Sequence, residues 1–123
     1  MKDYIEKALR TNAGSEKAIK RMNDDKIVDM LHGAMGISTE ANEILDVLKK
    51  HIFYGKEIDE LDLALECSDC LWYLAIILNR LGYDFETIMK MNIEKLQKRY
   101  PDKFNEDKAI NKNINEELKH FEG

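Results

Sequence analysis

The chain has 123 residues, of which 44% are hydrophobic and 35% charged, with a single proline. This length supports one domain with a modest core, the apolar content excludes general disorder, and the scarcity of proline favours long helices. The net charge of −5 argues against binding to nucleic-acid phosphates. The longest apolar run is only nine residues, from Cys70 to Leu78, and two cysteines make no disulfide framework, so we expect a cytoplasmic protein without a membrane span.

Apolar residues recur at helical spacing along the N-terminal half of the chain. They predict a short helix over about residues 3–10, followed by a polar connection over residues 11–24 with room for a helical turn. A long helix then runs from about Asp25 to Phe53, and Gly55 lies where its C-terminal cap is expected.

Helix start and stop signals divide the second half in the same way. Asp59 is a predicted N-cap for a third helix, which ends near Gly82. Asp84 caps a fourth helix, which must end near Tyr100 because Pro101 disfavours helical geometry in the residue before it.

The tail, residues 105–123, carries one apolar stripe at helical spacing: Ile110, Ile114, Leu118 and Phe121. No strand alternation or internal repeat stands out. We therefore predict an all-α fold, with a four-helix bundle core, a short N-terminal helix and a candidate C-terminal helix in the tail.

Two pairs of acidic residues interrupt the apolar faces of the two long helices. Glu40 and Glu43 are three residues apart, so they share one side of the second helix at the edge of its apolar stripe. Glu66 and Asp69 have the same spacing within the third helix, which is apolar almost all round between residues 63 and 78 and is therefore predicted to be central and buried. Facing carboxylate pairs would repel each other unless a cation lay between them. Four carboxylates without imidazole suit Mg²⁺, with Mn²⁺ as a substitute.

Two other interpretations of these acids have less support in the sequence. Paired glutamates at this spacing are common on solvated helices, and the first pair alone predicts little. A di-iron bundle requires a histidine three residues after a glutamate on two helices, and none of the three histidines lies three residues after one of these acids.

The fourth helix carries residues that could contact a phosphate held by such a cation. Asn92, Lys95 and Arg99 are spaced by three and four, so they line one face of that helix. Lys49, Lys50 and Lys56 fall near the turn between the two acidic helices. Taken alone, each of these would ordinarily be a solvated charge, but beside the acids Asn92 and Lys95 become candidate phosphate contacts. Trp72 and Tyr73 are most often core residues, although an aromatic ring beside the acids could stack on a base.

The sequence resembles the MazG-like all-α nucleoside triphosphate pyrophosphohydrolases. The resemblance runs from about residue 30 to residue 104, so we treat residues 1–104 as one domain. It rests on three stretches: GISTEANE at 36–43, ECSDCLWYL at 66–74 and NIEKLQKRYP at 92–101. Asn42 and Ser68 stand where the family commonly has glycine, so the chain departs from the family pattern at these two small residues.

The resemblance implies that Glu40, Glu43, Glu66 and Asp69 are the Mg²⁺ ligands. It also implies a homodimer or a tetramer of dimers, with bases bound near a subunit interface. We expect hydrolysis of a nucleoside triphosphate, in particular a deoxynucleotide, to monophosphate and pyrophosphate. Glu43 or Glu40 would be the general base, and the residues Asn92, Lys95 and Arg99 would hold phosphate oxygens.

Two alternatives to this function stay open on the sequence. One is a related phosphoribosyl-ATP pyrophosphohydrolase, for which the sequence offers no discriminating residue. The other is a non-catalytic helical interaction module with the same fold, against which the intact set of four acids argues.

Overall fold

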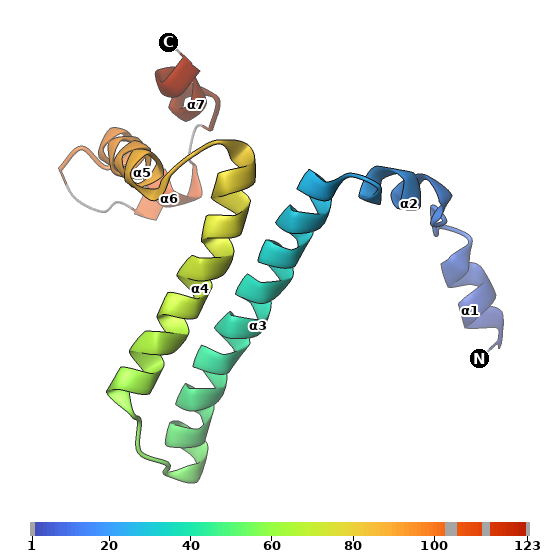
Figure 1. Ribbon diagram of the computed structural model, residues 1–123, viewed down its shortest axis with the longest axis horizontal. Coiled ribbons are helices and arrows are strands. Elements are labelled where there is room, and N and C mark those ends of the chain that lie inside the picture. Colours follow the sequence, from blue (N-terminus) through green and yellow to red (C-terminus); the bar gives the residue numbers. More distant parts are fainter. Residues whose placement is uncertain (1, 103–105, 112–113, 123) are drawn as a thin grey trace. The chain divides into compact units, whose positions relative to one another are not determined.

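The computed structural model describes residues 2–102, 106–111 and 114–122, and within these it contains helices and no strand (Figure 1). The predicted all-α fold is confirmed. The helices are α1 (Lys2–Leu9), α2 (Glu16–Met22), α3 (Asp25–Tyr54), α4 (Glu60–Leu81), α5 (Phe85–Arg99), α6 (Glu106–Ile110) and α7 (Ile114–Glu122). Among them, none is both long and apolar enough to cross a membrane.

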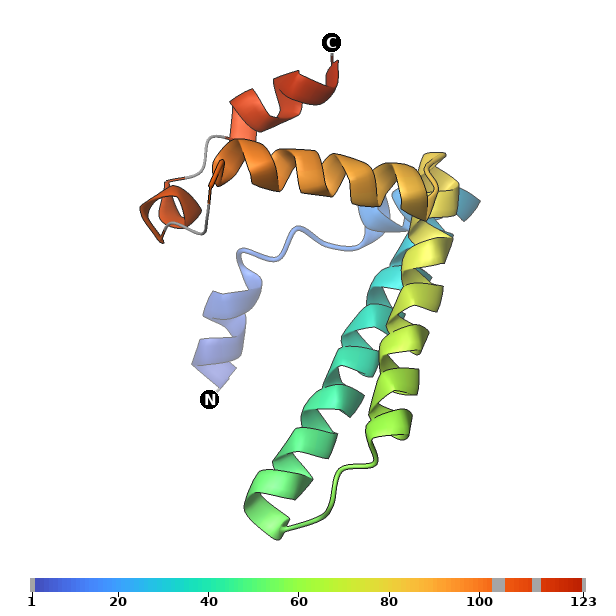
Figure 2. The same ribbon diagram turned by 90° about the vertical axis from the view of Figure 1, so that its left-hand side faces the viewer.

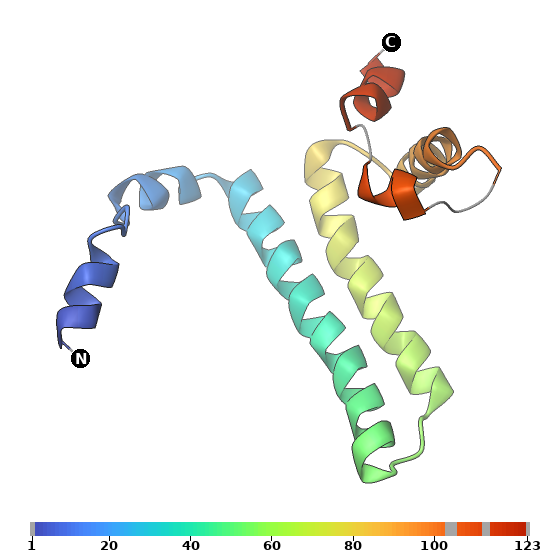
Figure 3. The same ribbon diagram turned by 180° about the vertical axis from the view of Figure 1, so that it is seen from behind.

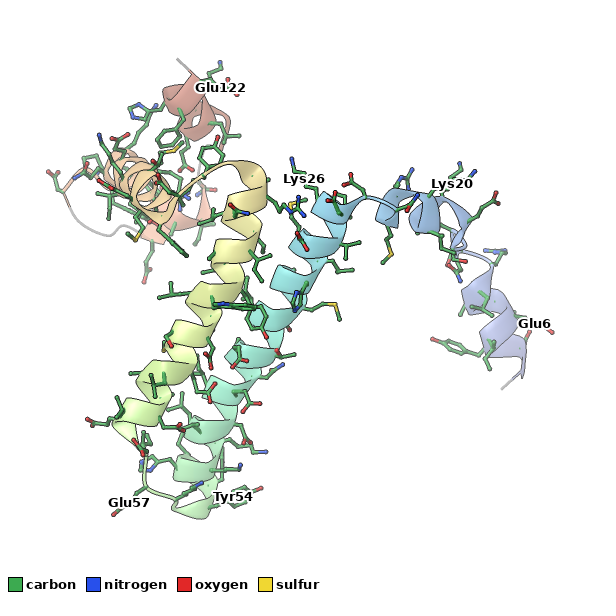
Figure 4. The ribbon with its side chains drawn as sticks, in the orientation of Figure 1. Glu6, Lys20, Lys26, Tyr54, Glu57 and Glu122 are labelled. Atoms are coloured by element: carbon green, nitrogen blue, oxygen red, sulfur yellow. The ribbon has the colours of Figure 1, made fainter. Side chains whose placement is uncertain are left out.

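The chain divides into two compact units, residues 1–80 and 81–123. In the first unit, α3 and α4 run side by side in opposite directions, as Figures 1 and 3 show. A short turn joins them, and Tyr54 and Glu57 mark this end of the pair in Figure 4. This helical hairpin brings the two acidic motifs onto neighbouring helices.

Local capping explains why the long helices begin and end where they do. Asp24 accepts a hydrogen bond from the backbone N–H of Lys26 at the start of α3, and Asp84 accepts one from Thr87 at the start of α5. Gly55 ends α3 with a left-handed φ of 69°, a conformation that glycine adopts without strain. The predicted boundaries of α3, α4 and α5 are therefore confirmed to within a residue or two.

Two glycines on α3 allow its backbone to approach α4 closely. A Cβ added at Gly33 would lie 2.6 Å from Cγ1 of Ile77 and 2.9 Å from the carbonyl oxygen of Tyr73. A Cβ at Gly36 would overlap the ring of Tyr73. Gly33 and Gly36 are also the two residues of α3 that are buried. These contacts set the spacing of the hairpin around its middle.

An ion pair joins the open end of the hairpin. Arg80, near the C-terminus of α4, donates from its guanidinium to the carboxylates of Asp29 and Asp25 on α3. The pKa of Arg80 is raised, mainly by its hydrogen bond to Asp29. Because these side chains are partly solvated, the pair contributes orientation more than stability.

The structure differs from the predicted elements in two places. Helix α2 forms within residues 11–24, which were predicted to be a polar connection, and it contacts α3. Its few apolar residues, Ile19 and Met22 among them, are too few to mark a helical stripe. The tail holds two short helices, α6 and α7, rather than a single one, and they are separated at Asn111.

The prediction that α4 is a central, buried helix is wrong for the single chain. No residue of α4 is buried, and Leu65 and Leu71 are 55% and 54% exposed. Among the described residues, no hydrophobic side chain reaches full burial. One neighbouring helix covers only one side of α4, so a helix that is apolar all round leaves its other sides uncovered.

The second unit contains α5, α6 and α7. Helix α7 contacts α5, and Figure 2 shows α7 beginning beside the C-terminal end of that helix. A paired guanidinium and carboxylate, Arg99 and Glu117, connect the two helices.

Candidate metal and nucleotide site

Three of the four predicted acidic ligands come together between α3 and α4. Carboxylate oxygens of Glu40, Glu66 and Asp69 all lie within 4.8 Å of one another. Glu40 and Glu66 are half-buried, whereas Asp69 is exposed. The three-residue spacing puts Glu66 and Asp69 on one face of α4, and the antiparallel hairpin turns that face toward Glu40 on α3. An all-oxygen group of this kind matches the preferences of a hard divalent cation.

The carboxylate cluster concentrates negative charge, and this affects the pKa of Glu66. The pKa of Glu66 is raised, first by a side-chain hydrogen bond with Glu40, then by partial desolvation and by the negative charges of Glu40, Asp69 and Asp62. Two carboxylates can share a hydrogen bond only if one of them keeps a proton. A cation could replace that proton, so the group suits metal binding chemically.

Glu43, the fourth predicted ligand, lies outside the carboxylate cluster. It is exposed, and it lines a neighbouring pocket of about 210 Å³ that also contains Glu66. We call this space the hairpin pocket; its lining is Glu43, Asp46, Val47, Lys50, Lys56, Glu57, Asp59, Asp62 and Glu66. Glu43 is therefore one wall of a pocket that begins at the carboxylate cluster.

Two lysines bring positive charge into this acidic pocket. Lys50 pairs with Asp46 at 2.7 Å, which raises the pKa of Lys50 and lowers that of Asp46. Lys56 follows the Gly55 cap, and its backbone N–H donates to the carbonyl of Lys50. The carbonyl of Lys56 lies 2.9 Å from Nδ1 of His51. The turn therefore holds the backbone of Lys56 at the pocket through two hydrogen bonds.

Like Asp46, Asp62 lines the pocket without having been predicted from the sequence. It lies one helical turn before Glu66, and its charge contributes to the raised pKa of Glu66. Its four-residue spacing from Glu66 on the same helix is the sequence feature that could have indicated its place beside Glu66. That spacing was hard to use because Asp62 stands in the first turn of α4, where acids are common for helix-dipole reasons.

The predicted phosphate contacts belong to the second unit. Asn92 and Lys95 on α5 line a pocket of about 190 Å³ together with Ile88, Met91 and Phe121. Arg99, one turn further along, donates from Nε and Nη2 to the two carboxylate oxygens of Glu117, at 2.7 and 2.8 Å. Asn92 and Lys95 thus share one pocket, while the guanidinium of Arg99 contacts α7.

Trp72 and Tyr73, the candidate base contacts, lie on α4 next to the acids. Their rings meet edge to face at 5.0 Å, and the ring of His32 on α3 lies 5.8 Å from that of Tyr73. Tyr73 packs against Gly36, whereas Trp72 is 59% exposed. Tyr73 therefore has a packing role between the helices, and Trp72 offers an exposed ring face.

Comparisons with known proteins identify the family. Residues 33–104 match the MazG nucleotide pyrophosphohydrolase domain. The chain is also similar to the Gene 37 protein of Mycobacterium phage L5, with 34% identity over 80 residues, covering 61% of this chain and 69% of that protein. No solved structure matches the chain significantly. The matched domain spans α4, α5 and most of α3, and so contains all four predicted ligands. The chain belongs to the MazG nucleotide pyrophosphohydrolase family.

Proposed function

We propose that this protein hydrolyses a nucleoside triphosphate, in particular a deoxynucleotide, to the monophosphate and pyrophosphate with Mg²⁺. The observation that carries the proposal is the carboxylate cluster of Glu40, Glu66 and Asp69, assembled inside a MazG domain. The proposed role is control or cleaning of the nucleotide pool in the cytoplasm.

The residues present fit a divalent cation. Glu40, Glu66 and Asp69 would hold it, and Glu43 would join them or hold a second ion, since it lines the adjoining hairpin pocket. When bound, Mg²⁺ neutralises phosphate charge and polarises the attacking water. Mn²⁺ is expected to substitute, because it accepts the same oxygen ligands.

The protein's own side chains supply the remaining functions. Glu43, which is exposed and outside the cluster, is the better placed of the two candidate bases, since Glu40 is one of the three clustered carboxylates. It would take a proton from the water that attacks the α-phosphorus, while the bond to the pyrophosphate oxygen breaks. Lys50 and Lys56 place positive charge in the hairpin pocket, where it can offset the charge of the leaving group. Asn92, Lys95 and Arg99 remain proposed phosphate ligands, and Trp72 a proposed base contact.

The reaction is tested with a panel of ribo- and deoxynucleoside triphosphates, Mg²⁺ and ¹⁸O-labelled water. The proposal requires monophosphate and pyrophosphate in equal amounts, with the label in the monophosphate. Label in pyrophosphate would move the attack to the β-phosphorus. Orthophosphate with diphosphate would exclude the proposed cleavage altogether.

A phosphoribosyl-ATP pyrophosphohydrolase is the second candidate, because it requires the same cleavage. Including phosphoribosyl-ATP in the panel separates the two, since kcat/KM for it should then exceed that for every plain triphosphate. A non-catalytic module would give no product with any of these compounds and would bind them without turnover.

We also propose that the protein works as a homodimer or a tetramer of dimers. Support comes from the large apolar side chains that remain exposed on α3 and α4, among them Leu65, Leu71 and Trp72. Such a surface is usually covered by a partner. Analytical ultracentrifugation across a hundredfold range of concentrations should show a species of two or four chains, and a monomer at every concentration would reject the proposal.

A further inference from the structure

The C-terminal helix α7 is attached to α5 through the same residue that is proposed to bind phosphate. Nε and Nη2 of Arg99 donate to the two carboxylate oxygens of Glu117 in a side-on, two-point pair. A phosphate would use parallel guanidinium N–H groups in the same manner. Glu117 therefore presents to Arg99 the kind of anion that a substrate would present.

This pair is more enclosed than the other ion pairs described in the chain. The side chain of Arg99 is 15% exposed and that of Glu117 is 9% exposed. Among the described residues, Glu117 is the one charged residue that is buried. The pairing raises the pKa of Arg99, so the guanidinium is charged at all physiological pH values. Partial desolvation strengthens the attraction between the two charges but also costs them hydration, and a phosphate must displace the carboxylate to reach this edge of the guanidinium.

A second contact places α7 beside the other predicted phosphate residues. The ring of Phe121 forms one wall of the pocket that contains Asn92 and Lys95. Phe121 lies one turn beyond Glu117 on α7, so both side chains are on the helix face that meets α5. The two anchors of α7 therefore lie against the face that holds the proposed phosphate ligands.

Other contacts of α7 are weaker. Lys98 donates to the backbone carbonyl of Glu116 at 3.2 Å, and Nε2 of His120 lies 3.5 Å from a carboxylate oxygen of Glu94. Leu118 is exposed and adds little burial. A nine-residue helix is marginal by itself, so α7 depends on its contacts with α5 and can open locally at modest cost.

We propose that α7 is an autoinhibitory strap, in which Glu117 competes with the substrate's phosphates for Arg99. With α7 docked, Arg99 is occupied and Phe121 stands at the Asn92–Lys95 pocket. Binding of a polyphosphate displaces Glu117 and releases α7, so the apparent affinity for substrate is lowered by the free energy that docks the strap. This inference rests on the proposed function in one respect, the role of Arg99 as a phosphate ligand.

The test uses the full chain and the variant Glu117→Gln, which keeps the size of the side chain and removes its charge. Loss of the competing anion should lower KM for the triphosphate roughly fivefold or more, with kcat within about twofold of wild type. Glu122→Gln is the matched control, because it removes the same charge from an exposed position on the same helix. KM of the control should equal that of wild type. An unchanged or higher KM for Glu117→Gln would overturn the strap and assign Glu117 a structural or positioning role.

A second variant protects the test against misfolding of the first. Phe121→Ser weakens the apolar anchor without altering the charges of Arg99 and Glu117, so it should lower KM in the same direction. In an Arg99→Met background, Glu117→Gln should no longer change KM, because the competition acts through Arg99. If Glu117→Gln still lowers KM there, the proposed mechanism is wrong.

A binding measurement separates failure of the strap from failure of the proposed function. Inorganic tripolyphosphate with Mg²⁺ is titrated into each variant by calorimetry, and hydrogen exchange of residues 114–122 is followed by mass spectrometry. Tighter binding to Glu117→Gln than to wild type, with faster exchange of α7 when tripolyphosphate binds to wild type, supports the strap even if no nucleotide is hydrolysed. Equal affinities, or unchanged exchange, overturn it even if the enzyme proves active.

Discussion

The carboxylates of Glu40 on α3 and Glu66 on α4 approach each other across the hairpin, and interaction with Glu40 raises the pKa of Glu66. Two acids held this close are unfavourable for the folded chain once both are ionised. The same arrangement becomes favourable when a cation binds between them.

Replacing Glu66 by Gln should abolish metal-dependent activity. The change removes one carboxylate from the cluster. Residues that only hydrogen-bond to a metal ligand cost up to about 100-fold in metal affinity or activity when they are mutated. Loss of a ligand itself should therefore lower Mg²⁺ affinity or kcat/KM by at least about 100-fold. Pyrophosphate release and calorimetric titration with Mg²⁺ measure the two effects. Glu60→Gln, an exposed acid at the start of the same helix, serves as the control and should retain activity. Full Mg²⁺-dependent activity of Glu66→Gln would remove Glu66 from the site.

The stability of the metal-free protein should carry a matching pH signature. Because the folded pKa of Glu66 is raised, the native state binds more protons than the unfolded state between the ordinary glutamate pKa and the raised value. The contribution of Glu66 to the free energy of unfolding therefore falls as pH rises through the folded pKa. The difference in the free energy of unfolding between wild type and Glu66→Gln, measured by thermal unfolding from pH 4 to pH 8, isolates this pH dependence. Saturating Mg²⁺ should reverse it, because the cation binds only the ionised acids.

Gly36→Ala should destabilise the hairpin. The added Cβ would overlap the ring of Tyr73, and relieving that overlap requires α3 and α4 to separate or the ring to leave its position. Overpacking of this kind costs about 1–3 kcal/mol, which chemical denaturation can resolve. Ser38→Ala, at an exposed position two residues later on α3, is the matched control and should be near neutral. Equal stability of Gly36→Ala and wild type would show that the helices do not pack as closely as described.

Trp72 should report base binding. It is the single tryptophan, it is 59% exposed, and it lies on α4 among the residues between Glu66 and Tyr73. Stacking of a nucleotide base should quench its fluorescence, whereas inorganic tripolyphosphate, which has no base, should leave the emission unchanged at saturation. Equal quenching by both ligands would assign the signal to metal or phosphate binding and remove Trp72 from the base pocket.

The features that could be predicted well from the sequence are the helix ends that depend on local contacts. Asp24 and Gly55 cap the two ends of α3 through contacts within one turn, and Asp84 caps the start of α5 in the same way. These helix ends can therefore be predicted from neighbouring residues alone. Helix α2 was expected to be at most a helical turn because seven residues with few apolar positions give no measurable stripe. The α6–α7 break near Asn111 was missed because the apolar spacing of the tail continues across it.

The chain's composition alone indicated a helical, acidic protein, and the spacing of its acids indicated a cation site. Those features depend on the 3.6-residue helical period, which is a property of the backbone and can be read along the sequence. The tertiary structure decided which acids meet: it joins Glu40 with Glu66 and Asp69, and places Glu43 on the wall of the adjoining pocket. It also decided that Arg99 faces Glu117. Such contacts depend on the separation and rotation of packed helices, and here the close approach at Gly33 and Gly36 sets both for the α3–α4 hairpin.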